Sequence, residues 1–117
     1  MSIAATLIVT LLLVLMFAAA GVGKVASLPQ SVGFRDHLAV PPPLWRGIGV
    51  LELCAVAGLL VGLAVPALAV LTAIGLALLS IGAIGSHLRS RDGAVHSLPA
   101  VVGLILAVAL ITLEIVR

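Results

Sequence analysis

Residues 44–64 have the sequence LWRGIGVLELCAVAGLLVGLA, an apolar run that contains a single carboxylate, Glu52. A helix that spans a bilayer needs roughly 20 mostly apolar residues, and this run is long enough. A carboxylate is costly to desolvate at membrane depth, so Glu52 has to be neutral, paired or hydrated there. Because ionisable residues inside membrane segments usually serve a function, we expect a functional site around Glu52.

Three further apolar runs accompany this one, at about residues 3–24, 67–88 and 98–116. The chain has 117 residues, of which 63% are hydrophobic and 9% charged. Soluble domains contain about 45–50% apolar and about 25% charged residues, so this composition is typical of a membrane protein. Lipid offers no partner to backbone polar groups, and such runs therefore span as helices. We predict an all-α fold, a membrane-spanning four-helix bundle formed by a single domain over residues 1–117.

The segment between the first two runs is too short and too polar to span. Residues 31–39 have mixed faces, and we predict a short interfacial helix or loop whose Val32, Phe34 and Leu38 side chains point toward lipid. A run of three prolines at 41–43 then gives the second spanning helix a sharp start, because proline is tolerated only in a helix's first turn. Trp45 is expected at headgroup level, which places Glu52 about 10 Å deeper.

The first apolar run contains three alanines at 18–20, which resemble a signal-peptide cleavage site. No basic residue precedes the run, and the run is long for a signal peptide, so we expect an uncleaved helix.

Basic residues are distributed unequally between the two sides of the predicted bundle. One side holds Lys24, Arg35, Arg46, Arg89 and Arg91, whereas the other holds Arg117. The positive-inside rule therefore predicts a multi-pass protein of the plasma membrane with both termini outside. The charges form no basic stripe, so we expect the lipid bilayer and not a nucleic acid as the partner.

Lys24, Glu52 and His87 come from three different spanning helices, all near the side with the basic loops. In a compact bundle they could converge into one ligand-binding site, suited to a quinone headgroup or another small polar head. Alternatives remain open at this point. Lys24 could instead extend to the interface, His87 could interact with the last carbonyls of its helix, and a Lys24–Glu52 pair could simply fix the helix arrangement.

Several chemistries have no support in the sequence. Three scattered histidines and the single cysteine, Cys54, predict no metal site and no disulfide within the chain. Cys54 is expected to be a small packing residue. No phosphate-binding loop or nucleophile elbow is present. We name no catalytic residue, leave open whether the chain is an enzyme, and identify no cofactor, although a quinone is a candidate ligand.

Three structural details are also predicted. Gly58 with Gly62, and Gly82 with Ser86, form small-residue faces that allow close helix packing, and we expect a homo-oligomer or a larger membrane complex. Ser97 is expected to cap the last helix, with Pro99 in its first turn. Glu114 and Arg117 are expected to form an exposed pair.

The order and spacing of several short motifs resemble the DoxX-like family of small four-helix membrane proteins of bacteria and archaea. These motifs are Phe17 with Gly21-x-x-Lys24, Phe34 with Pro41, Gly49-x-x-Glu52-Leu53, Gly58-Leu59, Gly82-Ala83 with His87-Leu88, and Pro99-Ala100. The family takes its name from a small subunit associated with an archaeal terminal oxidase and thiosulfate:quinone oxidoreductase, and relatives are linked to methylamine-utilisation maturation.

The resemblance implies an accessory, non-catalytic subunit of a membrane redox or respiratory complex. Two other hypotheses stand beside it. One is a binder or carrier of a quinone, lipid or other amphiphile through the site around Glu52, and the other is an independent membrane enzyme. The resemblance supplies no catalytic residues, and a lone Cys54 at membrane depth argues against thiosulfate chemistry.

Overall fold

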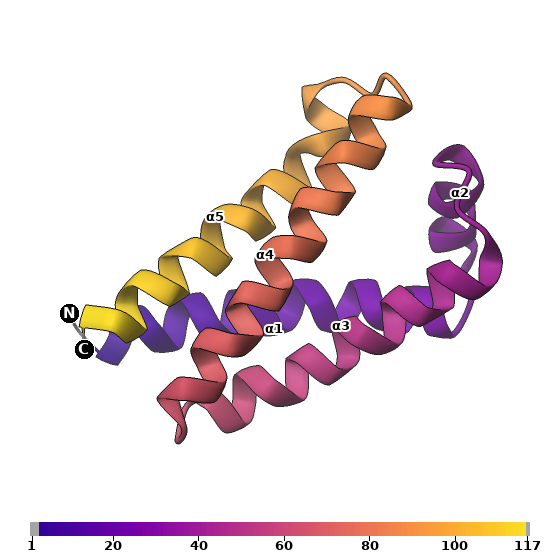
Figure 1. Ribbon diagram of the computed structural model, residues 1–117. Coiled ribbons are helices and arrows are strands. Elements are labelled where there is room, and N and C mark those ends of the chain that lie inside the picture. Colours follow the sequence, from indigo (N-terminus) through magenta and orange to yellow (C-terminus); the bar gives the residue numbers. More distant parts are fainter. Residues whose placement is uncertain (1–2, 117) are drawn as a thin grey trace.

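The computed structural model describes residues 3–116, except for the side chains at positions 94 and 95. Four long helices are apolar enough to span a membrane: α1 (Ile3–Val25), α3 (Pro42–Gly62), α4 (Pro66–Arg89) and α5 (Ala94–Val116). A short helix, α2 (Pro29–His37), lies between the first two (Figure 1). The predicted all-α membrane bundle with a short intervening segment is confirmed, and the start of α1 and the end of α5 lie at the same end of the bundle.

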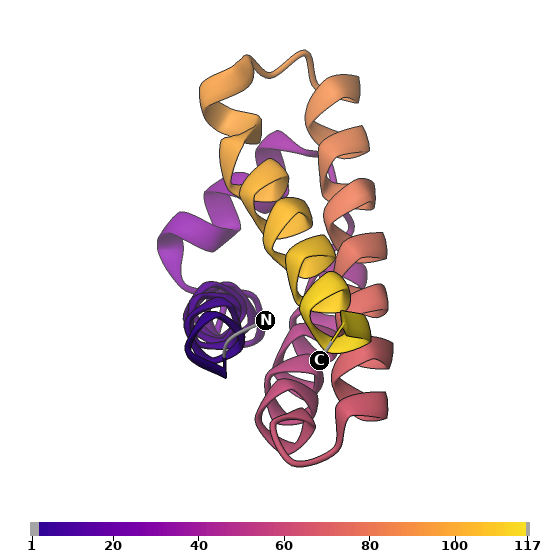
Figure 2. The same cartoon turned by 90° about the vertical axis from the view of Figure 1, so that its left-hand side faces the viewer.

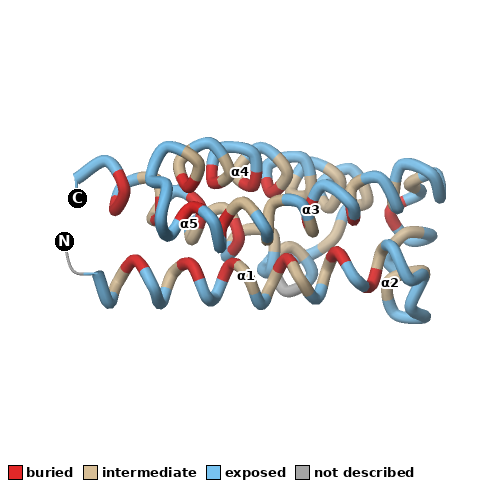
Figure 3. The backbone as a smooth tube through the Cα atoms, turned by 90° about the horizontal axis from the view of Figure 1, so that it is seen from below, coloured by how far each residue is buried: buried red, intermediate tan, exposed pale blue. Residues whose placement is uncertain are grey.

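The bundle consists of two helix pairs. α1 packs mainly against α3, and α4 against α5, while contacts of α3 with α4 and of α1 with α5 join the pairs. The buried core contains Leu13, Phe17, Leu59, Leu76 and Leu110. Buried residues lie on the inward faces of the helices and exposed ones on the outer surface (Figure 3). That outer surface carries many large apolar side chains, as expected where lipid replaces water.

The two pairs diverge toward one end. The hairpin of α4 and α5 separates from α1 and α3 in the direction of the end that carries α2 and the α4–α5 turn (Figures 1 and 2). We call this the loop end. The divergence leaves room between the pairs, and the candidate site lies there.

Glycines set the closest helix contacts. A Cβ atom added at Gly21 would lie 2.8 Å from Leu53 Cγ and 3.0 Å from the backbone oxygen of Gly49. One added at Gly49 would lie 2.7 Å from Lys24 Cβ. Real Cβ atoms do not approach this closely, so α1 and α3 can cross at this distance only because both positions are glycine.

The predicted small-residue faces have different outcomes. A Cβ atom at Gly58 would lie 2.5 Å from Thr72 Oγ1, and one at Gly62 would lie 2.8 Å from Ala69 Cα, so these glycines bring α3 and α4 together. Close packing at Gly58 and Gly62 is confirmed, within the α3–α4 hairpin. The prediction that the face of Gly82 and Ser86 packs closely against another helix of the chain is wrong, because an added Cβ at Gly82 would meet nothing within 4 Å.

Three helices end in the same backbone motif. Past the ends of α1, α2 and α4, the residues Ser27, Ala39 and Arg91 have left-handed conformations, with φ of 53°, 56° and 58°. The next residue in each case donates its N–H to a carbonyl five positions earlier, at 3.0, 3.1 and 2.9 Å respectively. This is the Schellman arrangement, which usually places glycine at the left-handed position. The motif fixes the direction in which the chain leaves each helix.

Other local predictions are corrected. α5 begins at Ala94, because the N–H of Ser97 already donates to the Gly93 carbonyl at 3.2 Å, so Ser97 is not a cap and Pro99 lies inside the helix. Glu114 is buried, which contradicts an exposed pair, and Arg117 lies outside the described residues. Cys54 is exposed on α3 and is not a core residue.

Candidate functional site

Lys24 and Glu52 form an ion pair between α1 and α3. Lys24 Nζ lies 2.9 Å from Glu52 Oε1, and the side chains retain only 14% and 6% of their accessible surface. Each charge follows a contact glycine by three residues, Gly21 in α1 and Gly49 in α3, and so lies about one turn farther along the helix. The close backbone crossing therefore brings the two side chains within reach of each other.

Trp45 and Ser31 hold Lys24 in this inward position. The Lys24 ammonium lies 4.6 Å from the centroid of the Trp45 ring, a cation–π contact. The indole Nε1 of Trp45 in turn donates a hydrogen bond of 2.9 Å to Ser31 Oγ in α2. Lys24 therefore turns toward Glu52 and does not extend to the interface, and Trp45 forms part of the site in addition to any role at the membrane surface.

The Glu52 carboxylate keeps unused capacity to accept hydrogen bonds. Its Oε1 is buried and, among the described residues, accepts no well-aligned hydrogen bond, although the Lys24 ammonium lies 2.9 Å away. The contact is thus an ion pair whose geometry leaves lone pairs free, since a carboxylate offers about four acceptor positions. Buried acceptors of this kind normally find a partner, and a ligand donor could supply it.

A cavity of about 940 Å³ lies beside the pair, in the space between the two diverging helix pairs. All five helices contribute to its wall. Most of the lining is apolar, with polar side chains that include Lys24, Glu52, Ser80, His87 and His96. Ligand pockets in proteins have volumes of about 300–1,000 Å³ and combine apolar walls with a few polar groups, and this cavity fits that description.

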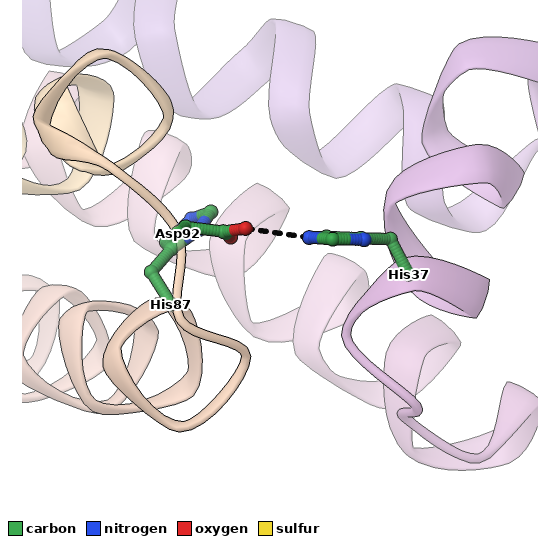
Figure 4. A network of polar contacts seen from close by, with 3 residues as sticks. All are labelled: His37, His87 and Asp92. Carbon is green, nitrogen blue, oxygen red and sulfur yellow. Dashed lines mark hydrogen bonds and ion pairs between the residues drawn. The ribbon is translucent and has the colours of Figure 1, made fainter.

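His87 lies on the same cavity but does not contact Glu52 directly. Its Nδ1 is 2.6 Å from Oδ2 of Asp92, in the α4–α5 turn. The other oxygen of Asp92, Oδ1, is 2.6 Å from Nε2 of His37, at the end of α2 (Figure 4). The structure thus places Lys24, Glu52 and His87 on one cavity. They belong to two separate polar groups there, the Lys24–Glu52 pair and the His37–Asp92–His87 network.

The sequence did not identify His37 and Asp92 as site residues. Asp92 precedes Gly93, and this pair of residues indicates only a turn. The five-residue spacing from His87 to Asp92 is the one available signal, because a Schellman ending pairs residues at that distance. His37 offered no signal, since its partner lies 55 residues away in the sequence.

The environment of Asp92 favours its ionised form. Hydrogen bonds from the His37 and His87 side chains, in that order, hold the pKa of the Asp92 carboxyl below its ordinary value. The side chain retains only 6% of its accessible surface, so it depends on these two imidazoles for partners. Asp92 is therefore a fixed negative charge between two helices that are distant in sequence.

Within residues 3–116, apart from the two undescribed side chains, no group of three or more His, Cys, Asp or Glu residues is arranged to hold a metal ion. The described geometry is suited to holding a polar headgroup and an apolar body.

Of three comparisons with known proteins, the one with family models gives a match. No curated protein and no solved structure matches the chain. The model of the DoxX-like family matches residues 8–110, which include all four spanning segments in whole or in large part and every residue of the two polar groups. The chain is a small multi-pass integral membrane protein, and it belongs to the DoxX-like family.

Proposed function

We propose that this protein binds a small amphiphile within the bilayer and holds its headgroup at the Lys24–Glu52 pair. The observation that carries the proposal is the buried pair itself, which lines a cavity of about 940 Å³ and leaves Glu52 Oε1 without a well-aligned hydrogen bond. A pair that only fixed the helices would need no cavity beside it. An accessory role in a membrane redox complex rests on the family resemblance and stays a prediction.

The charge of the site favours a neutral headgroup. Lys24 and Glu52 compensate each other, so an added ionic headgroup would be buried without a counterion in a medium of low dielectric constant. The ligand should donate a hydrogen bond to the Glu52 carboxylate and accept one from the Lys24 ammonium. The head of a quinone in its quinol form has this chemistry, as does the hydroxyl-bearing head of a neutral lipid.

The test is purification in mild detergent followed by mass spectrometry of the extracted lipids. The wild-type protein should retain a neutral amphiphile in near-stoichiometric amount. The double variant Lys24→Met/Glu52→Gln removes both charges together, so it leaves no unpaired charge, and it should retain at most about a tenth as much, a loss typical of removing a charged hydrogen-bonded contact.

Glu114→Gln is the matched control. Glu114 is also a buried carboxylate in a spanning helix, but it does not line the cavity, so the variant should retain the amphiphile. Equal retention by wild type and the double variant would contradict the proposal. A stoichiometric protein partner in place of a lipid would favour the accessory role.

Orientation and assembly belong to the same proposal. The basic loops support a cytoplasmic position for the loop end, both termini outside, and residence in the plasma membrane. Labelling of a Gly93→Cys variant in a Cys54→Ser background, in sealed cells, would test the orientation, and labelling from outside would contradict it. Mass measurement in mild detergent would test self-association.

A further inference from the structure

A hydrogen bond joins α2 to the α4–α5 turn across the loop end of the bundle. His37 Nε2 at the end of α2 lies 2.6 Å from Asp92 Oδ1 (Figure 4). The two residues belong to the two sides of the bundle that diverge toward this end, since α2 packs on α1 and Asp92 follows α4. The bond therefore bridges the divergence.

The bond also lies in the wall of a second, smaller cavity. This cavity has a volume of about 330 Å³ and is lined by Gln30, Gly33, Phe34, His37, Asp92 and His96. Gln30, Phe34 and His96 line the larger cavity as well, so the two spaces adjoin. The His37 side chain is 54% exposed while that of Asp92 is 6% exposed, which places the bond between the solvent and the cavities.

Asp92 is the fixed side of this bond. Its backbone N–H donates to the His87 carbonyl at 2.9 Å, and its carboxylate is 2.6 Å from His87 Nδ1. The left-handed conformation of Arg91 directs the chain so that both contacts are made. Contacts with His87 thus hold the Asp92 carboxylate in position at the end of α4 without the hydrogen bond from α2.

α2 is the side that can move. No residue within α2 is buried, although Leu38 immediately after it is. The helix is connected at both ends through residues in left-handed conformation, Ser27 and Ala39, where the chain changes direction. Segments with little buried apolar surface open at low free energy, so the position of α2 over the cavity depends strongly on its polar contacts.

We propose that α2 is a lid over the solvent side of the cavity and that the His37–Asp92 hydrogen bond is its latch. With the latch closed, water and charged solutes are kept away from the Lys24–Glu52 pair. The biological value of the lid rests on the proposed binding of an amphiphile, but the latch can be tested with no ligand present.

The test measures how fast a charged, water-soluble reagent reaches the interior of the cavity. Cys54 is first replaced by Ser, and Ser80→Cys then supplies a single thiol. Ser80 is buried at 4% exposure, lines the cavity, and lies about 14 Å along α4 from Arg89. The probe is a trimethylammonium methanethiosulfonate, which does not partition into lipid, and its rate of reaction is measured in nanodiscs.

Labelling should be slow with the latch intact. In His37→Ala it should be at least about tenfold faster, because a hydrogen bond to a charged group is lost. Asp92→Asn tests the same bond from its other side and should also label faster. His37→Gln offers an amide N–H in place of Nε2 and should restore much of the protection.

Asp36→Asn is the matched control. Asp36 is the neighbouring residue of α2, it is exposed, and it pairs with Arg35 and not with the α4–α5 turn. This variant should label as slowly as the parent. Equal rates in the parent, His37→Ala and Asp92→Asn would overturn the latch, and so would equal acceleration by Asp36→Asn, which would indicate general loosening of α2.

The outcome is independent of the lipid measurement above. If the His37 and Asp92 variants label no faster than the parent but the wild-type protein still retains an amphiphile, the lid is contradicted and the binding proposal stands. Faster labelling in the latch variants without any co-purified amphiphile would establish the lid and contradict the binder.

Discussion

The inner Lys24–Glu52 pair and the outer His37–Asp92–His87 network each hold a carboxylate beside basic side chains, but different parts of the fold position them. In each, basic side chains lie beside a largely buried carboxylate: one beside Glu52 and two beside Asp92. The inner pair is positioned by regular helices that meet at two glycines. The outer network depends on a turn and on a short helix with no buried residue. The first should therefore be rigid and important for stability, and the second adjustable and important for access.

The largest effect is expected from removing the positive charge of the inner pair. Lys24→Met leaves the buried Glu52 carboxylate without its partner, which should lower the free energy of unfolding by about 3–5 kcal/mol. Denaturant titration in detergent micelles would measure it. Adding Glu52→Gln to Lys24→Met should recover most of the loss, and a double variant as unstable as Lys24→Met alone would show that packing, not charge, is responsible.

The glycine crossing can be tested separately from the charges. Gly49→Ala places a Cβ atom 2.7 Å from Lys24 Cβ, so the helices must shift. We expect a loss of about 1–3 kcal/mol in the free energy of unfolding, despite the better helix propensity of alanine.

Gly47→Ala is the control for Gly49→Ala on the same helix. A Cβ atom at Gly47 meets nothing within 4 Å, so propensity alone should stabilise the protein by about 0.5–1 kcal/mol. Changes of opposite sign in the free energy of unfolding would support a close glycine-dependent crossing of α1 and α3, whereas equal changes would contradict it.

The outer network should be sensitive to its turn. Arg91 adopts a left-handed conformation, which costs a non-glycine residue about 1–2 kcal/mol. Arg91→Gly should therefore raise the free energy of unfolding by about 1 kcal/mol while the His37–Asp92 bond is retained. Arg89→Gly, inside the last turn of α4, should instead destabilise, and stabilisation by both would show that removal of positive charge is the cause.

The smallest effect is expected from pH. The folded-state pKa of Asp92 is depressed, so its hydrogen bonds stabilise the protein fully above the ordinary aspartate value of about 3.9. That contribution is lost as the pH falls through the lower folded-state value. His37 from α2 and His87 from α4 face the carboxylate, and His96 from α5 lines the same small cavity. The unfolding temperature of wild type should fall more steeply below about pH 4 than that of Asp92→Asn, and parallel curves would contradict the assignment.

The sequence predicted the inner site better than the outer one for physical reasons. Glu52 is conspicuous because a carboxylate inside an apolar run is expensive, and Gly21 and Gly49 lie at fixed helical spacing from the two charges. The His37–Asp92 contact depends on how three chain segments leave their helices. The left-handed endings use Ser27, Ala39 and Arg91, none of which is the glycine that normally marks such a position. The prediction for Gly82 and Ser86 failed because small residues also line cavities.

The crossing of α1 and α3 has a consequence for how the chain enters the membrane. α1 is synthesised first, and Lys24 lies in its last turn. When α3 follows, Glu52 carries an insertion penalty of about 2.5–3.5 kcal/mol if it enters the lipid alone, taking aspartate as its analogue. With α1 already in place, Gly21 and Gly49 allow α3 to pack closely against it. This packing brings the Glu52 carboxylate to the Lys24 ammonium. Insertion of α3 beside a correctly placed α1 is therefore expected to be more favourable than its insertion alone.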